Sequence, residues 1–126
     1  MIRKKYIKVD YSKDALFDSV GLQRLKDSYM RSDEESPQDR FSYVARSFGS
    51  NPEHAQRLYT YLSNHWLSAA TPILSYGLGK RGMPISCFLS YIDDSAEGLI
   101  DTLSEACWLS IQGGGVGLGL GIRSAD

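Results

Sequence analysis

The chain has 126 residues, of which 42% are hydrophobic and 23% charged, and these shares are those of an ordinary soluble globular protein. This length allows at most one domain with a modest core. The formal net charge of −1 excludes a bulk electrostatic attraction to nucleic acid or to an acidic membrane. No apolar run approaches the roughly 18 residues of a membrane span, and the basic start lacks the apolar segment of a signal peptide. We therefore expect a cytoplasmic protein that binds neither nucleic acid nor a membrane.

The cysteines and histidines form no recognisable disulfide or metal pattern. Cys87 and Cys107 are too few for a disulfide scaffold or a zinc site. His54 and His65 stand apart on a helical pattern, and histidines of this kind are more often packing or surface residues than ligands. No metal ligand is therefore assigned in this chain.

Residues 1–68 predict a helical region in which no pattern points to chemistry. The first helix is expected over about 13–30, with Ser12 as its N-cap. Gly21 lies inside this stretch, and an interruption is expected there because glycine is a poor helix former. The region is assigned no site.

Two further helices have sharper start signals, because each opens with a capping residue followed by proline. These signals are Ser36-Pro37 and Asn51-Pro52, and Gly49 is expected to end the earlier helix. Apolar residues recur at helical spacing behind both starts, which predicts one buried face on each helix. The positions are Phe41, Val44, Ala45 and Phe48 in the earlier helix, and Ala55, Leu58, Leu62, His65 and Trp66 in the later one.

The character of the sequence changes after residue 68. Thr71-Pro72 is expected to break the helix, since proline disfavours the helical conformation of the residue before it. The glycines and proline of residues 76–84 indicate a loop. A short strand is predicted over 85–92, and it is too apolar to alternate cleanly, as is typical of a strand covered on both faces.

A helix and a second strand follow. Asp93-Asp94-Ser95 opens a helix over about 96–111, and residues 116–122 form a glycine-rich strand. The expected inner face of this helix consists of Leu99, Leu103, Ala106 and Ser110 or Ile111. A strand, a helix and a strand make a βαβ unit, so the two strands should be parallel neighbours. Two parallel strands cannot cover their own edges, which predicts a fragment or one half of a split protein.

The glycine-rich run GGGVGLGLG occupies residues 113–121. It matches neither the dinucleotide fingerprint nor the Walker loop. Glycine leaves space beside the backbone, which either a ligand or a closely packed neighbouring element can use. Both interpretations stay open, and both can hold together.

The remaining candidate residues have ordinary interpretations when each is taken alone. Asp93 and Asp94 lie at a helix start, where acids are favoured by the helix dipole. Cys87 lies in an apolar strand and Cys107 in a helix, and isolated cysteines of this kind are usually inert packing residues.

The combination of these features is more specific than any one of them. Thr71-Pro72, Ser86-Cys87, Asp94-Ser95 and Gly113-Gly114-Gly115 together resemble the start of the catalytic barrel of ribonucleotide reductase large subunits. The resemblance covers roughly residues 66–126. It implies an α/β fold in which a helical region, 1–68, precedes the start of a ten-stranded α/β barrel, 69–126. Only the first strand-helix-strand unit of that barrel is present, so the fold is expected to be incomplete alone.

The resemblance implies a role for each residue at the substrate site. Cys87 would be the redox-active thiol that reduces the ribose 2′ position, forming a disulfide with a cysteine on a later strand outside this segment. Cys107 would not be that partner. Thr71 and Ser86 would contact the substrate diphosphate, and Gly114 and Gly115 would let the backbone lie against the ribose and base.

The resemblance also implies an allosteric site for a deoxynucleotide effector. Asp94, Ser95 and Ala96 would open the loop that binds the effector, with the acid accepting a hydrogen bond from its sugar. Arg123 would lie near the effector phosphates. No metal ligand is implied among these residues.

The implied enzyme is a class I-like ribonucleoside-diphosphate reductase, of which this chain would be the amino-terminal part, inactive without a complementary large-subunit chain. The implied partners are that chain, a second large subunit in a dimer, a small radical-generating subunit with a di-iron or di-manganese centre, and thioredoxin or glutaredoxin. Deoxynucleotides and ATP would be the effectors, and no cofactor would bind this segment itself. The alternatives are an adenosylcobalamin-dependent (class II) reductase, a non-catalytic nucleotide-binding module, and a structural remnant without a ligand.

Overall fold

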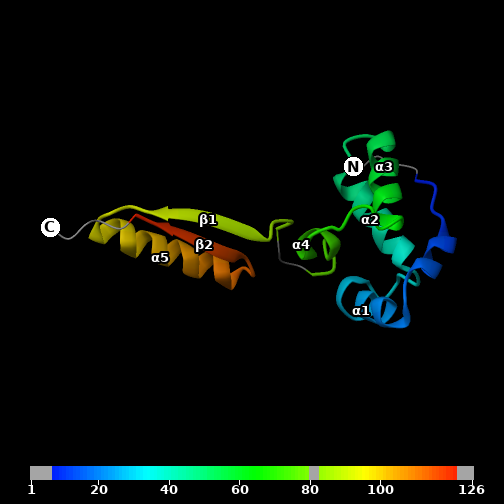
Figure 1. Cartoon of the computed structure of the whole chain (residues 1–126), viewed down its shortest axis with the longest axis horizontal. Coiled ribbons are helices and arrows are strands. Elements are labelled where there is room, and N and C mark those ends of the chain that lie inside the picture. Colours follow the sequence, from blue (N-terminus) through cyan, green and yellow to red (C-terminus); the bar gives the residue numbers. More distant parts are fainter. Residues whose placement is uncertain (1–6, 80–82, 122–126) are drawn as a thin grey trace. The chain divides into compact units, whose positions relative to one another are not determined.

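The computed structural model describes residues 7–79 and 83–121, and the chain divides into two compact units, Met1–Lys80 and Arg81–Asp126. The described part of the first unit is helical, whereas the second unit holds two strands and a helix (Figure 1). The helices and strands expected over most of the chain are therefore present. No helix among the described residues has both the length and the apolar character needed to cross a membrane.

The first unit contains one 3-10 helix and four α-helices in its described residues. Their bounds are Tyr11–Leu16 for the 3-10 helix η1, Ser19–Tyr29 for α1, Pro37–Phe48 for α2, Pro52–Ser63 for α3 and Thr71–Leu74 for α4.

The single helix predicted over 13–30 is wrong, because two aspartates cap two separate helices. The Asp10 carboxylate accepts a hydrogen bond from the Ser12 amide (3.1 Å) and caps η1. The Asp18 carboxylate accepts from the Gly21 amide (2.6 Å) and caps α1. Ser12 is therefore not the N-cap, and Gly21 lies inside α1 instead of interrupting it. The break comes before Asp18, where a side-chain oxygen satisfies a free helix N–H.

The two proline-containing start signals are confirmed. Ser36 caps α2, and the Asp39 carboxylate accepts from the Ser36 amide (3.1 Å), so the two residues form a reciprocal capping box. Asn51 caps α3 by accepting a hydrogen bond from the His54 amide (2.8 Å). Gly49 is the C-cap of α2, as predicted.

The core of the first unit lies mainly between α2 and α3. The extended segment before η1 adds Ile7, which is only 5% exposed. The buried cluster consists of Ile7, Phe41, Val44, Ala45, Ala55, Tyr59 and Leu62. These are largely the residues that the helical periodicity predicted to be buried.

The chain leaves α3 earlier than its apolar pattern predicted. The helix ends at Ser63, and His65 has a positive φ of 59°. Trp66 is consequently 73% exposed and does not extend the buried stripe. His65 instead packs edge-on against the ring of Phe17, with 4.4 Å between ring centroids. Thr71, predicted to be non-helical, is the first residue of α4, because proline is well tolerated in a first helical turn.

The second unit is one βαβ motif. Its elements are β1 (Cys87–Ile92), α5 (Ala96–Ile111) and β2 (Gly115–Leu120). The strands are parallel, with a register that runs from Cys87↔Gly115 to Ile92↔Leu120. Ser95 caps α5 by accepting from the Gly98 amide (2.9 Å). The predicted topology and helix start are confirmed.

The inner face predicted for α5 is correct at Ala106 and wrong at its other positions. Its least exposed residues are Gly98, Thr102, Ala106 and Leu109, which recur at helical spacing and are mostly small. The large residues expected inside are exposed: Leu99 by 55%, Leu103 by 61% and Ile111 by 72%. A narrow helix face can approach a two-stranded sheet closely, so the small residues face the sheet.

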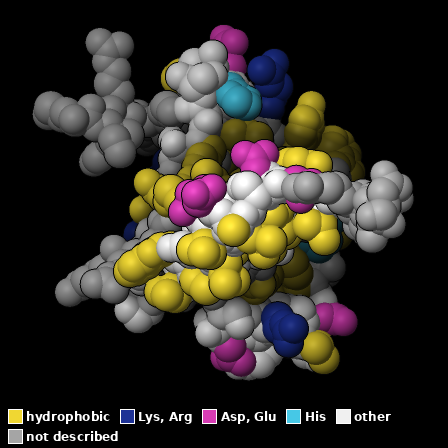
Figure 2. All heavy atoms as spheres, turned by 90° about the vertical axis from the view of Figure 1, so that its left-hand side faces the viewer, with side chains coloured by type: hydrophobic (Ala, Val, Ile, Leu, Met, Phe, Trp, Pro, Cys, Tyr) yellow, Lys and Arg dark blue, Asp and Glu magenta, His cyan; other side chains and the backbone are white. Residues whose placement is uncertain are grey.

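The prediction that β1 is covered on both faces is also wrong within this chain. Exposure alternates along the strand, and Leu89 and Tyr91 are 88% and 67% exposed. Hydrophobic side chains gather on the face of this unit that is turned to the viewer in Figure 2. The second unit therefore presents apolar surface that its own elements do not cover.

Candidate functional site

The sheet of the second unit has one face against α5 and one open face. Ser90 lies toward α5, because its hydroxyl donates to a Glu105 carboxylate oxygen (3.3 Å). Side chains alternate between the two faces along a strand, so Cys87, Leu89 and Tyr91 lie on the other face. The register places the glycines of β2 beside these three residues. Cys87 and the glycines thus share the open face of the sheet.

Most glycines of β2 are already covered by side chains of β1. A Cβ atom on Gly117 would lie 2.8 Å from Leu89 Cδ2, and one on Gly119 would lie 3.2 Å from Tyr91 Cδ2. A Cβ atom on Gly121, which follows β2, would collide with the Tyr91 hydroxyl. Close packing against neighbouring side chains therefore accounts for these three glycines.

Gly115 differs because the space beside it is open toward the thiol. The nearest atoms to a Cβ on Gly115 would be the Ser86 carbonyl oxygen at 3.4 Å and Cys87 Sγ at 3.8 Å. The Gly115 amide donates to that same Ser86 carbonyl (2.8 Å). Gly114 lies against the Phe88 ring, which a Cβ would approach to 2.5 Å. Ser86, Cys87, Gly114 and Gly115 are therefore brought together where both strands begin.

Cys87 and Cys107 are both exposed free thiols. Cys87 lies on the open face of the sheet, whereas Cys107 lies on α5. A disulfide partner for Cys87 is not found among the residues that the structure describes. Within the same ranges, 7–79 and 83–121, no three His, Cys, Asp or Glu side chains form a group that could hold a metal ion.

Asp94, Ser95 and Ala96 lie at the opposite end of β1 from Cys87. A strand rises about 3.3 Å per residue, which places the two ends of β1 about 17 Å apart. The Ser95 hydroxyl oxygen is engaged in capping α5, and Ala96 is the first residue of that helix. The amides of a helix N-terminus favour anions. The predicted effector residues thus form a second cluster, separate from the thiol; Arg123 falls outside the described residues.

Thr71 belongs to the first unit, at the start of α4. Its hydroxyl lies 3.3 Å from the hydroxyl of Tyr29 on α1. Its carbonyl accepts a hydrogen bond from the Ser75 hydroxyl (2.7 Å). Thr71 is exposed, so the face of α4 that carries it is accessible within this unit.

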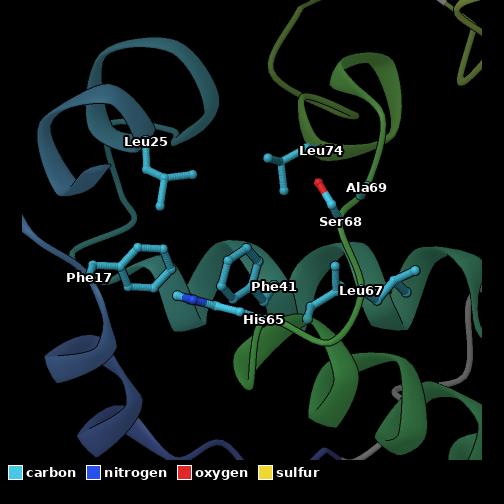
Figure 3. Close-up of a pocket in the computed structure, with 9 residues that line it drawn as sticks. Phe17, Leu25, Phe41, His65, Leu67, Ser68, Ala69 and Leu74 are labelled. Atoms are coloured by element: carbon cyan, nitrogen blue, oxygen red, sulfur yellow. The ribbon is translucent and has the colours of Figure 1, made fainter. Parts of the chain in front are cut away.

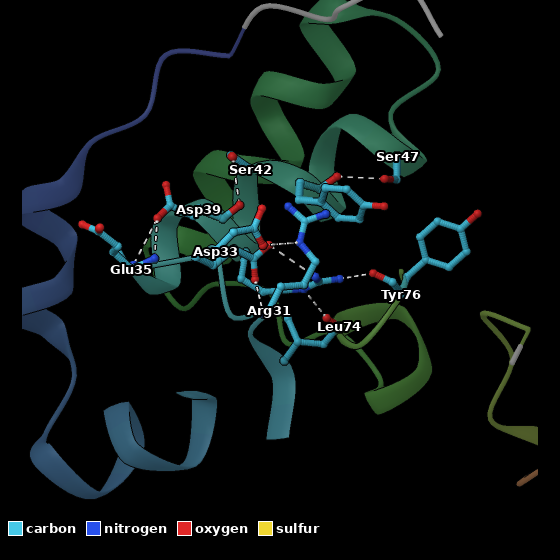
Figure 4. A network of polar contacts seen from close by, with 12 residues as sticks. Arg31, Asp33, Glu35, Asp39, Ser42, Ser47, Leu74 and Tyr76 are labelled. Atoms are coloured by element: carbon cyan, nitrogen blue, oxygen red, sulfur yellow. Dashed lines mark hydrogen bonds and ion pairs between the residues drawn. The ribbon is translucent and has the colours of Figure 1, made fainter. Parts of the chain in front are cut away.

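The structure adds a residue that the sequence patterns missed, Arg40 on α2. Its side chain is fully buried. Nε donates to the Leu74 carbonyl (2.7 Å) and Nη2 to the Tyr76 carbonyl, while Nη1 lies 3.4 Å from a Glu34 carboxylate oxygen (Figure 4). Burial lowers the pKa of the Arg40 guanidinium, and the Glu34 charge opposes that shift. Its place in the sequence could have indicated its burial, because Arg40 precedes the buried Val44 by one helical turn and so lies on the same face of the helix.

An apolar pocket lies among α1, α2, α4 and the segment that follows α3 (Figure 3). Its lining residues are Phe17, Leu25, Phe41, Leu62, His65, Leu67, Ser68, Ala69 and Leu74. The only polar side chains in that set are His65 and Ser68. Such a lining suits the packing of helices more than the charged phosphates of a nucleotide, and we assign it no ligand.

Comparison with known proteins covers nearly the whole chain. Over 118 residues it is 58% identical to the ribonucleoside-diphosphate reductase large subunit of Invertebrate iridescent virus 6, which covers 94% of this chain and 12% of the viral protein. Over 121 residues the chain is 58% identical to the corresponding protein of Invertebrate iridescent virus 3, and this match covers 95% of the chain and 19% of the viral protein. The large chain of Encephalitozoon cuniculi is 35% identical over 123 residues, covering 92% and 16%.

The chain thus spans between 12% and 19% of the length of these relatives. A family model described as "Ribonucleotide reductase, all-alpha domain" matches residues 15–82. That match includes α1 to α4 and ends before β1. The chain therefore belongs to the ribonucleotide reductase large-subunit family, with the family's all-alpha domain over residues 15–82.

Proposed function

We propose that this chain supplies a redox-active thiol and part of the substrate site for the reduction of ribonucleoside diphosphates. The observation that supports this most directly is the meeting of Ser86, Cys87 and Gly115 at one edge of the sheet. The thiol is exposed there, and the glycine beside it leaves the space open. An exposed thiol next to uncovered backbone suits a reaction in which a substrate must approach sulfur closely.

The proposed chemistry uses the thiols as the source of electrons. Replacing the 2′-hydroxyl of ribose by hydrogen, with release of water, consumes two electrons and two protons. Cys87 and a second cysteine outside this segment supply both when their two thiols become one disulfide. Thioredoxin or glutaredoxin then reduces that disulfide. A small subunit with a di-iron or di-manganese centre supplies the radical that starts the reaction.

The proposed substrate contacts are the residues that the family resemblance implies. Thr71 and Ser86 contribute their hydroxyls and neighbouring backbone donors to the diphosphate. Gly114 and Gly115 let the backbone lie against the ribose and base. Phosphate binding by hydroxyls and backbone amides is common in nucleotide sites. The names of the relatives, ribonucleoside-diphosphate reductases, favour a diphosphate as the substrate.

The effector site lies at the far end of β1. Asp94 accepts a hydrogen bond from the sugar of a deoxynucleotide or ATP, and Ser95 and Ala96 open the loop that receives it. Arg123, which lies outside the described residues, is the proposed partner of the phosphates. The separation of the two clusters along one strand supports this division. An element that touches both sites is a physical route for coupling substrate choice to effector identity.

The remainder of a large subunit completes the sheet as a ten-stranded α/β barrel. The apolar side chains left exposed on α5 and on the open face of the sheet support this proposal, since exposed apolar patches usually mark contact surfaces. The complete large subunit forms a dimer and binds the small subunit. Without the complementary large-subunit segment this chain is inactive.

A chimeric enzyme tests the proposal. Residues 1–126 replace the matching segment of the Invertebrate iridescent virus 6 large subunit, and the chimera is assayed with its small subunit for deoxynucleotide formation. We expect activity, and we expect Cys87→Ser to lower turnover by at least about a thousandfold, because the serine hydroxyl does not supply electrons as a thiol does. Cys107→Ser is the matched control and should retain activity. Full activity of the Cys87→Ser chimera would show that this thiol is not the reductant.

A further inference from the structure

Helix α4, which carries Thr71 at its start, is too short to hold its own shape. It has only four residues, Thr71–Leu74, and isolated helices of that length are unstable in water. Its N-cap residue, Ala70, makes no side-chain capping bond. The position of the Thr71 hydroxyl therefore depends on contacts from outside the helix.

Arg40 supplies the contacts at the far end of α4. Its guanidinium donates to the carbonyls of Leu74 and Tyr76, the last residue of the helix and a residue just beyond it (Figure 4). Carbonyls at a helix C-terminus lack partners within the helix. They also carry the negative end of the helix dipole. The buried Arg40 guanidinium supplies both the missing hydrogen-bond donors and a positive charge at this end.

Arg40 is itself held in place on its remaining sides. Glu34, whose side chain is only 3% exposed, lies 3.4 Å from it. The Arg40 guanidinium carbon lies 4.9 Å from the centre of the Tyr43 ring, and that of Arg31 lies 4.5 Å from the same ring. Gly77 follows α4 with a positive φ of 81°, and a Cβ there would lie 2.5 Å from the Tyr43 hydroxyl. The anchor is therefore fixed by charge, ring stacking and close packing together.

Tyr29 supplies the contact at the near end of α4. Its hydroxyl lies 3.3 Å from the Thr71 hydroxyl, and either group can be the donor. If Tyr29 donates, the Thr71 proton is free to point at a ligand oxygen. One bond thus orients the hydroxyl while Arg40 fixes the helix behind it.

We propose that Arg40 and Tyr29 are positioning residues for substrate binding, Arg40 by fixing α4 and Tyr29 by orienting the Thr71 hydroxyl. This inference rests on the proposed function, in which Thr71 contacts the substrate diphosphate. Neither residue touches the substrate in this arrangement. Both act through Thr71.

The test compares KM and kcat for the substrate in the chimeric enzyme. Tyr29→Phe removes one hydroxyl and keeps the ring, so it is the variant least able to disturb folding. Because a hydrogen bond contributes about 0.5–1.5 kcal/mol, we expect KM to rise about two- to tenfold with kcat unchanged. Tyr61→Phe on α3 is the matched control, since Tyr61 is 44% exposed and lies outside the network.

Arg40→Lys keeps the charge but cannot reach both carbonyls and Glu34 with the fork of a guanidinium. We expect KM to rise at least as much as in Tyr29→Phe. A purely structural role for Arg40 would instead lower the thermal midpoint and the fraction of active enzyme, and so the apparent kcat, at unchanged KM. Arg57→Lys, at an exposed position of α3, controls for the substitution itself.

Thr71→Val separates this inference from the proposed function, because it removes the hydroxyl and keeps the shape of the side chain. An unchanged KM in Thr71→Val removes Thr71 from the substrate site, and the positioning roles are then overturned with it. A raised KM in Thr71→Val, together with Tyr29→Phe and Arg40→Lys matching their controls, overturns only the positioning roles. A raised KM in Thr71→Val, Tyr29→Phe and Arg40→Lys supports both.

Discussion

At the scale of single residues, buried polar side chains hold loops and helix ends in place. Arg40 fixes the end of α4, and Tyr59 ties the segment before η1 to α2 and α3. The Tyr59 hydroxyl accepts from the Asp10 amide (2.8 Å) and donates to the Gln38 amide oxygen (3.0 Å). Neither residue was assigned a role from the sequence, because periodicity predicts which positions are buried but not which carbonyls a buried side chain will meet.

Tyr59→Phe should destabilise the first unit and change its response to alkali. Removal of the hydroxyl leaves a buried Gln38 oxygen without its donor, which costs about 1–3 kcal/mol. Burial raises the pKa of Tyr59 above its ordinary 10.0. The folded state therefore holds this proton more tightly than the unfolded state does. The contribution of the protonated hydroxyl to the free energy of unfolding is complete below pH 10, and it is lost as the pH rises through the pKa of the folded state.

Urea unfolding followed by circular dichroism at neutral and alkaline pH measures both effects. We expect the difference in stability between wild type and Tyr59→Phe to shrink as the pH rises above the ordinary pKa. Tyr61→Phe, on the same helix at an exposed position, should show neither effect. If the difference in free energy of unfolding between wild type and Tyr59→Phe stayed constant with pH, the claim that folding buries Tyr59 in its un-ionised form would be contradicted.

At the scale of elements, local signals were sufficient where one side chain decides the outcome. Ser36 and Asn51, each followed by proline, predicted the starts of α2 and α3, since a cap and a proline act within a single turn. The split into η1 and α1 was missed because Asp18 competes with Ser12 for the same role, and only the path of the chain decides between them.

The faces of the second unit were harder to predict, because they depend on what each element meets. The large apolar residues of α5 were expected to face the sheet together with Ala106, yet small residues such as Gly98 and Thr102 accompany Ala106 instead. The strand order and direction were predicted correctly, since the length of the crossover leaves only a parallel pair. A hydrophobic pattern therefore identifies an apolar face, but it does not show whether an element of this chain covers that face.

The two ends of β1 give a prediction about regulation. Asp94→Ala should raise the effector concentration needed for half-maximal response about tenfold or more, since a hydrogen bond to a charged group contributes about 1.5–3 kcal/mol. Basal turnover should change less than this. Asp101→Ala, an exposed acid on α5, is the control for charge. The measurement is substrate reduction by the chimera across a series of deoxynucleotide concentrations.

An effector profile of Asp94→Ala that matches both wild type and Asp101→Ala would leave Asp94 as an ordinary acid at a helix start. In that case the effector role would be removed from Asp94. The redox role proposed for Cys87, at the other end of β1, would be unaffected.

At the scale of the whole molecule, the chain combines a helical unit that has its own core with a βαβ unit that leaves apolar surface exposed. The uncovered apolar surface agrees with the comparison, because the chain matches less than a fifth of the length of its relatives. The all-alpha domain supports Thr71 through α4, and the βαβ unit presents Cys87 on its open face. The proposed activity belongs to the complete large subunit, and Cys87 is proposed to be one of its two electron-donating thiols.

The most direct test of that claim is the redox state of Cys87 after one turnover. The chimera is reduced, freed of external reductant, and allowed a single turnover with substrate and small subunit. Thiols are then alkylated and the peptides that contain Cys87 and Cys107 are quantified by mass spectrometry. We predict that Cys87 loses its reactivity in proportion to the deoxynucleotide formed and regains it after treatment with dithiothreitol, while Cys107 stays alkylated throughout. Deoxynucleotide formation with Cys87 still fully alkylated would contradict the account.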